Sequence, residues 1–245
     1  MNAMLGAGAA ALALLWIMAL APWISRTAST RLRASLCQDI EATRSAQAHE
    51  LMPRVLAAPA QRRVFWLLAA VWSIGFAALW LRVGVSSWSA VAYSLFFAVL
   101  FVASLIDLDT QLLPTPMVGA ILWAGILAAL TGLVPLSLER AVLGAAAGWI
   151  LFSLPNLILA AARTDASPAV GAGDISFLAA AGAWLGPQQT IAAGCLAVVF
   201  ASLVTLGLRI ARPAAQAHTL LPFGPLISVA AIAMLCFDPY HHFMA

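Results

Sequence analysis

Long apolar runs separated by short polar breaks occupy most of this 245-residue sequence. An α-helix needs about 20 apolar residues to cross the roughly 30 Å hydrocarbon layer of a bilayer. Because 64% of the residues are hydrophobic and only 9% are charged, a single soluble core cannot bury this much apolar surface. The sequence therefore predicts an all-α, polytopic membrane protein with about eight transmembrane helices. The predicted spans are 1–24, 64–81, 89–106, 117–134, 141–162, 175–185, 190–208 and 222–237.

The predicted spans divide the chain into three parts. Residues 1–24 contain no acidic or basic side chain and predict an N-terminal transmembrane anchor. Residues 25–63 form the one long polar segment, and residues 64–245 hold the remaining spans, which we assign to one membrane domain. Leucine or isoleucine recurs every four residues from Leu32 to Ile40. Part of the polar segment is therefore either an amphipathic helix on the membrane surface or a plain connector.

The arginines predict how the spans are oriented. All twelve basic residues are arginine, and alternating sides from an external N-terminus leaves only Arg82 and Arg140 outside. This excess of cytoplasmic arginine is the distribution that the positive-inside rule expects. Asp107 and Asp109 then end the third span, and Asp174 begins the sixth, all at the cytoplasmic edge. These acids can meet there.

Asp174 is the most chemically distinctive residue of the chain. It ends the glycine segment Gly171-Ala-Gly173-Asp174 and precedes an apolar run, 175–185, that has no ionisable side chain. An acid at the edge of a membrane-length apolar layer is a functional candidate. Gly171 and Gly173 permit positive φ and leave no side chain beside the acid, so another backbone can approach it closely. A flexible turn ahead of a helix is the simpler alternative.

Two of these carboxylates, brought together, would form a catalytic dyad. Close like charges do not both ionise readily, so the pair shares one proton near neutral pH. One member then activates water as a base, while the protonated member polarises a peptide carbonyl. Asp107 and Asp109 lie about 200° apart around a helix, so only one of them can face Asp174. The spacing alone does not choose between them, and an interfacial helix end is the alternative explanation for either.

Three segments of the chain, taken together, resemble a known family. They are Leu105-Ile-Asp107-Leu-Asp109-Thr-Gln-Leu-Leu-Pro114, Gly171-Ala-Gly-Asp174 with the following 178–186, and Leu221-Pro-Phe-Gly-Pro-Leu226. In this order they resemble the type IV prepilin peptidases, membrane aspartic proteases of the GxGD type, over about 64–245. In that family the first catalytic aspartate lies seven residues before the proline, and the second is the acid of the GxGD motif. The resemblance implies Asp107 and Asp174 as catalytic residues, and Pro114, Gly171 and Gly173 as substrate-binding or structural motif residues.

The resemblance implies an aspartic endopeptidase of the bacterial inner membrane that serves type IV pili or type II secretion. It would remove the short basic leader of prepilins or pseudopilins after a glycine, at the cytoplasmic face. Thr115 stands where the family commonly has Asp or Asn, and Ser176 stands where Lys is common. Two alternatives remain: a relative that binds pilins without cutting them, and a proton-coupled transporter whose acids relay protons.

The cysteines and the basic residues limit the expected partners. Cys37, Cys195 and Cys236 are far apart and form no CxxC pair, so no structural zinc site is predicted. Bifunctional members of the resembled family carry a zinc-binding cysteine set in the first cytoplasmic loop and methylate the new N-terminus, whereas this loop has only Cys37. We therefore expect a peptidase without methyltransferase activity, metal or other cofactor. The expected partners are a prepilin and the lipid bilayer; nucleic acid is not one, because no basic stripe with interleaved aromatics is present.

Overall fold

The structure is a computed structural model of the whole chain. It describes residues 70–78, 88–162, 169–211 and 222–237, with the single residues 27, 30, 31 and 34. All regular elements in this described part are helices, and none is a strand. The predicted all-α class is thereby confirmed. The predictions for the first span, for Cys37 and for most of the polar segment fall outside the described residues.

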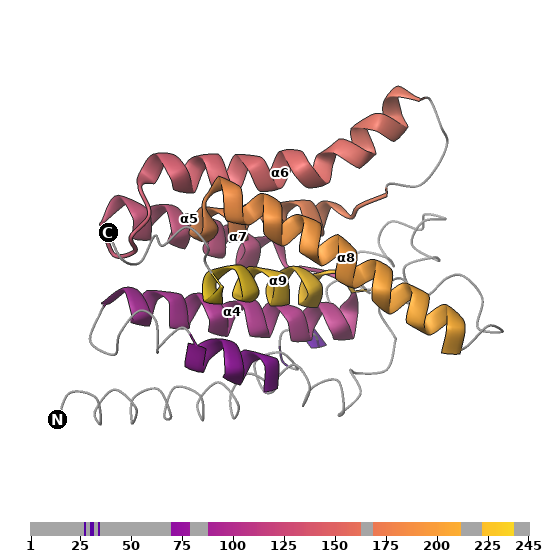
Figure 1. Cartoon of the computed structure of the whole chain (residues 1–245), viewed down its shortest axis with the longest axis horizontal. Helices are drawn as coiled ribbons and strands as arrows, with labels where there is room; N and C mark the ends of the chain where they lie inside the picture. The colour runs from indigo at the N-terminus through magenta and orange to yellow at the C-terminus, as the bar shows by residue number, and fades with distance from the viewer. Residues whose placement is uncertain are drawn as a thin grey trace.

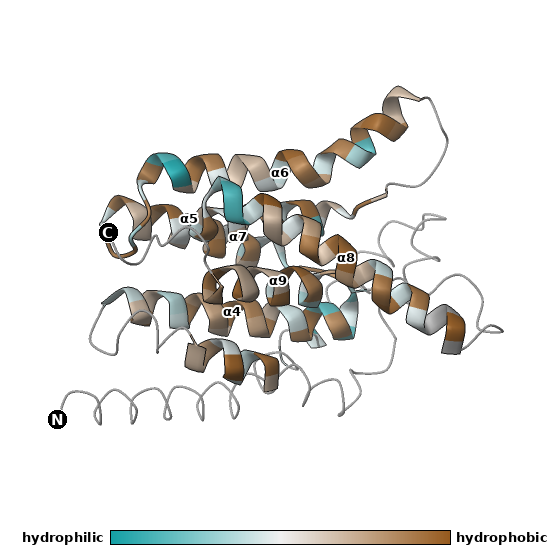
Figure 2. Cartoon of the chain, viewed as in Figure 1, coloured by the Kyte–Doolittle hydropathy of each residue, from teal (hydrophilic) through white to brown (hydrophobic). Residues whose placement is uncertain are grey.

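Six helices are labelled in the bundle (Figure 1). They are α4 (Trp88–Thr110), α5 (Thr115–Leu130), α6 (Leu138–Ala161), α7 (Ala172–Leu185), α8 (Pro187–Ala211) and α9 (Gly224–Cys236). Figure 2 shows most of their length in brown, which marks hydrophobic residues, and only a few turns in teal, which marks hydrophilic ones. α4 continues beyond the predicted end at residue 106, and α7 begins before the predicted start at 175. Asp107 and Asp174 consequently lie within helices, each in a terminal turn.

The helices fall into two length classes. α4, α6 and the part of α8 up to Gly207 are long and apolar enough to cross a membrane. The apolar helices α5, α7 and α9 have 16, 14 and 13 residues. At about 1.5 Å per residue, α7 is about 21 Å long, which is shorter than the hydrocarbon layer. Within the described part of the chain there are thus three candidate membrane spans, and the total of eight transmembrane helices stays a prediction.

α7 is the central helix of the bundle. Every residue from Phe177 to Leu185 is buried, and the helix contacts α5, α6, α8 and α9. Burial on all sides explains why the run is apolar on every face. Near its end, the Trp184 indole N–H donates to the Ile121 carbonyl oxygen of α5 at 2.9 Å, and the ring stacks on Phe96 of α4. These contacts hold α7, and with it the first-turn residue Asp174, against its neighbours.

α6 and α7 approach each other through glycines. A Cβ atom added at Gly144 would collide with the carbonyl oxygen of Gly182, and one at Gly148 would lie 2.7 Å from the carbonyl oxygen of Leu178. Residues four apart lie on one face of a helix, and small residues at this spacing allow close helix packing in membranes. The absence of side chains at these positions therefore sets the distance between the two backbones.

Gly144→Ala is expected to lower the midpoint of thermal unfolding in detergent. The added methyl group has no room against α7, and overpacking a well-packed core costs about 1–3 kcal/mol. Gly119→Ala on α5 is the matched control, because a Cβ there has nothing within 4 Å. This control should unfold at the wild-type temperature or slightly above it, since alanine favours a helix more than glycine does. Equal midpoints for the two variants would contradict the close α6–α7 contact.

Candidate active site

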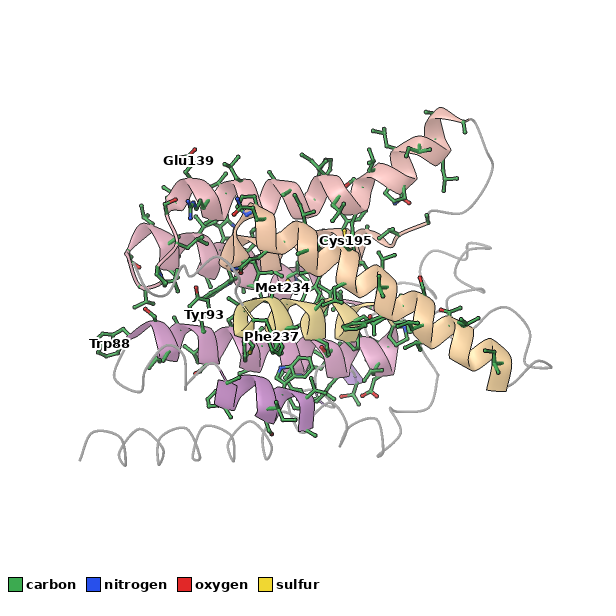
Figure 3. All side chains as sticks on the ribbon, in the orientation of Figure 1. Trp88, Tyr93, Glu139, Cys195, Met234 and Phe237 are labelled. Carbon is green, nitrogen blue, oxygen red and sulfur yellow. The ribbon has the colours of Figure 1, made fainter. Side chains whose placement is uncertain are left out.

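Asp107 and Asp174 lie at the same end of the bundle. α4 begins at Trp88, at the left of Figure 3, so its last turn with Asp107 lies at the opposite end. α7 begins at that opposite end, with Asp174 in its first turn. Both residues line one cavity of about 380 Å³. The structure therefore brings together the two acids that the sequence predicted to meet.

The cavity is built from two chain segments that are distant in sequence. One segment is the end of α4 with the following loop and the start of α5, and the other is the start of α7. The lining residues are Asp107, Gln111, Leu112, Leu113, Thr115, Val118, Gly171, Ala172, Gly173, Asp174 and Ser176. A concave site with two acids and several apolar side chains can hold a peptide segment next to a pair of proton-transfer groups.

Of the two acids near the end of α4, Asp107 is the one that lines the cavity. Gln111, one helical turn later on the same face, lines it as well. Asp109 is also buried, at 7% exposure, but it is not among the lining residues. The helix ends at once after these acids, because Gln111 has a φ of 56° and turns the chain toward α5. The structure thus selects between two positions that helical spacing alone left open.

A backbone hydrogen bond orients the Asp107 carboxylate. Its Oδ2 atom accepts from the Gly224 N–H at the start of α9, at 2.8 Å, and the side chain is only 3% exposed. One turn away, the buried hydroxyl groups of Ser104 and Ser228 form a second hydrogen bond between α4 and α9, at 3.0 Å. Hydrogen bonds from backbone N–H to a carboxylate are short and strong. The sequence did not predict that Gly224 would hydrogen-bond to Asp107. It pointed only to the segment Leu221–Leu226, which contains Gly224, as one of the three segments that resemble the family.

The two glycines before Asp174 leave space around its carboxylate. Gly171 is the N-cap of α7 with φ −65° and ψ 145°, and Gly173 is already helical; neither has positive φ. The freedom to adopt positive φ is therefore not used here, because the helix starts directly after Gly171. The glycines instead leave space beside the acid, as the sequence analysis also expected. A Cβ on Gly171 would lie 3.1 Å from the Asp174 Oδ2 atom, and one on Gly173 would lie 3.5 Å from the Leu113 Cβ atom.

Pro114 directly precedes α5, and the two departures from the family pattern, Thr115 and Ser176, lie in the cavity that holds the acids. Pro114 is the N-cap of α5, and its carbonyl oxygen accepts from the Met117 and Val118 N–H groups. Thr115 and Ser176 both line the cavity. The Ser176 hydroxyl donates to the Ala172 carbonyl oxygen at 3.0 Å. A substrate in the cavity would therefore meet both residues.

A second cavity, of about 400 Å³, lies between α4 and α5. The residues that line it, among them Leu95, Leu127 and Trp184, are mainly apolar, and none is ionisable. Acid–base chemistry therefore belongs to the cavity with the two aspartates.

Across the described ranges, no three His, Cys, Asp or Glu side chains gather as metal ligands would. The expectation that the polar segment binds no zinc stays a prediction, because Cys37 lies outside those ranges.

Comparison with known proteins identifies similar sequences. Residues 94–210 match the sequence model of the type IV leader peptidase family. A "Type 4 prepilin-like proteins leader peptide-processing enzyme" of Escherichia coli is 35% identical over 154 residues, covering 61% of this chain and 52% of that enzyme. A "Prepilin leader peptidase/N-methyltransferase" of Aeromonas hydrophila is 36% identical over 152 residues (62% and 51%), and one of Pseudomonas aeruginosa is 36% identical over 160 residues (62% and 51%). The chain spans about half the length of these curated relatives, and no solved structure matches it.

Proposed function

This chain belongs, through residues 94–210, to the type IV leader peptidase family, and from this premise we propose that it is an aspartic endopeptidase of the bacterial inner membrane. Its substrates are type IV prepilins or pseudopilins, whose short basic leader it removes after a glycine at the cytoplasmic face. The observation that carries the proposal is the shared cavity of Asp107 and Asp174, which come from different helices. A dyad formed in this way needs no metal or other cofactor.

In the proposed reaction, one carboxylate of the dyad takes a proton from water while the other, protonated, donates a hydrogen bond to the scissile carbonyl oxygen. The water oxygen bonds to the carbonyl carbon, the C–N bond breaks, and the leaving nitrogen takes up a proton. The products are a leader with a new carboxyl terminus and a pilin with a new amino terminus. The Gly224 N–H holds the Asp107 carboxylate in one orientation, which reduces reorganisation during the reaction.

The position of the cavity suits a substrate that is half polar and half apolar. Its acids lie in the terminal turns of two apolar helices, at one end of the bundle. A prepilin has a basic leader outside the membrane and an apolar helix within it, so its scissile bond lies at the same boundary. The volume of about 380 Å³ is within the range of specific ligand sites and accommodates a short extended peptide.

We further propose that the chain does not methylate the new N-terminus. The Aeromonas hydrophila and Pseudomonas aeruginosa relatives both carry N-methyltransferase in their names. The polar segment 25–63 of this chain has Cys37 as its single cysteine, so it lacks the cysteine set of the bifunctional members. Peptidase activity alone is therefore the proposed function.

Co-expression of the full chain with a prepilin tests this function. Mass spectrometry of the pilin N-terminus should show loss of the leader with the wild type, and an intact leader with a double Asp107→Asn, Asp174→Asn variant. A pilin heavier by one methyl group would refute the proposed lack of methylation. An intact leader with the wild type, across several pilins, would favour a relative that binds without cutting. Thr115 and Ser176 would then be the first positions to change.

A further inference from the structure

α6 contains a proline near its end, and the residue after this proline reaches toward the segment that precedes Asp174. Pro155 lies inside the helix and cannot donate a backbone hydrogen bond to the preceding turn. Figure 1 shows the end of α6 rising away from the bundle. Asn156 follows the proline, and its Nδ2 atom donates to the Val170 carbonyl oxygen at 2.8 Å while its Oδ1 atom accepts from the Val170 N–H at 3.0 Å. One amide side chain thus satisfies both backbone groups of a single residue.

Val170 is joined directly to the part of the chain that carries the acid. The next residue, Gly171, is the N-cap of α7, and its carbonyl oxygen accepts from the Ile175 N–H at 3.1 Å. Gly171 also lies against the Asp174 carboxylate, since an added Cβ would be 3.1 Å from Oδ2. The position of the Val170 backbone therefore sets where α7 begins and where its first-turn acid lies.

We propose that Asn156 is a positioning residue for Asp174, acting through its paired hydrogen bonds to Val170. The inference rests on the proposed function and adds to it a residue outside the three motif segments. The role requires one donor and one acceptor on the same short side chain. Asparagine supplies both, and a protonated aspartic acid does so as well. Alanine supplies neither, and an ionised aspartate lacks the donor and places negative charge against the Val170 carbonyl oxygen.

Asn156→Ala is expected to lower kcat for prepilin cleavage by about 10- to 100-fold, because displacements of about 1 Å at a reacting group have effects of this size. KM should change less than about twofold, since Asn156 is not among the residues that line the cavity. Hydrogen–deuterium exchange of the purified full chain gives a readout that does not depend on cleavage. The amide of Val170 should exchange faster in Asn156→Ala than in the wild type.

Asn156→Asp separates positioning from a general loss of structure. Its activity relative to wild type, measured at each pH, is expected to rise as the pH falls from about 7 toward about 4, because an aspartic acid becomes protonated near its ordinary pKa of about 3.9 and protonation restores the donor. Asn156→Ala is the matched control, and its relative activity should stay constant over this range because it adds no titratable group. Of the helices packed against α6, α7 contributes Asp174, α8 contributes Cys195 and Arg209, and α5 contributes no ionisable residue. Glu139 and Arg140 lie at the opposite end of α6. Dividing the activity of each variant by the wild-type activity at the same pH cancels the pH dependence that Asp107 and Asp174 give to both enzymes.

The outcomes distinguish this inference from the proposed function. Cleavage by the wild type, with an unchanged kcat in Asn156→Ala or a pH-independent ratio for Asn156→Asp, would overturn the positioning role and leave the peptidase assignment standing. Unchanged exchange at Val170 in Asn156→Ala would overturn it even if the wild type cleaved no prepilin. Faster exchange, together with recovery of Asn156→Asp at low pH, would establish it.

Discussion

Asp174→Asn is expected to reduce prepilin leader cleavage to below about 1% of the wild-type rate, and Asp107→Asn is expected to do the same. Asparagine has nearly the same shape as aspartate but can neither take a proton from water nor donate one as an acid. General acid–base groups contribute about 10²- to 10⁴-fold to a rate, so losing either member of the dyad should have an effect of this size. The measurement is the fraction of pilin with a mature N-terminus, read by mass spectrometry as a function of time.

Asp109→Asn is the matched control for this loss. Asp109 lies two residues from Asp107 on the same helix and is also buried, but it does not line the cavity. Its amide variant should therefore keep most of the wild-type activity. If Asp107→Asn and Asp174→Asn both cleaved the leader at the wild-type rate, the dyad would be refuted. An inactive Asp109→Asn with an active Asp107→Asn would move the catalytic role to Asp109.

Gly224→Ala is expected to lower kcat by about 100-fold, although residue 224 carries no reactive group. A Cβ at this position would lie 2.8 Å from the Asp107 Oδ2 atom and 3.1 Å from its Cγ atom, so either the carboxylate or the start of α9 must move. The hydrogen bond from the Gly224 N–H would be strained or lost. A shift of about 1 Å at a catalytic group can cost about 10²-fold in rate. The measurement is a comparison of kcat and KM on a prepilin substrate.

Two controls show whether the effect comes from the contact with Asp107. Gly119→Ala adds the same methyl group to an α5 position where a Cβ has nothing within 4 Å, and should leave kcat unchanged. Ser228→Ala removes the other hydrogen bond between α4 and α9, one turn away, without touching the carboxylate. Its effect on kcat should be much smaller than that of Gly224→Ala. A Gly224→Ala enzyme with wild-type kcat would show that Asp107 tolerates displacement.

Thr115 and Ser176 line the cavity with hydroxyl side chains. The resemblance gives Asp or Asn as the common residue at the first position and Lys at the second. If the chain cleaves leaders as proposed, the bound substrate contacts both residues, and we expect their substitution to change which leaders are cleaved.

The sequence by itself determined the helical class, the approximate bounds of the helices and the end of the bundle at which the acids gather. These follow from physical rules that act locally, since apolar run length, turn residues and arginine distribution are properties of short stretches. Local rules singled out Asp107, Asp109 and Asp174 as candidate acids and Gly171 and Gly173 as their neighbours. The choice of Asp107 over Asp109 and the role of Pro114 were implied by the resemblance to the type IV prepilin peptidases, and the catalytic roles stay predictions. The helix starts and ends were less accurate, because α4 and α7 extend into stretches where polar residues suggested a break.

Only the tertiary structure decided which atoms hold these acids in place. Helical spacing placed Asp107 and Asp109 on different faces, but the packing of α4 against α9 and α5 determined which face borders the cavity. The Gly224 N–H bond to Asp107 and the Asn156 bonds to Val170 join segments that are far apart along the chain, so no local pattern predicts them. The physical reason is that hydrogen bonds and close contacts depend on distances between helices, which are set by how whole side chains and glycine backbones pack.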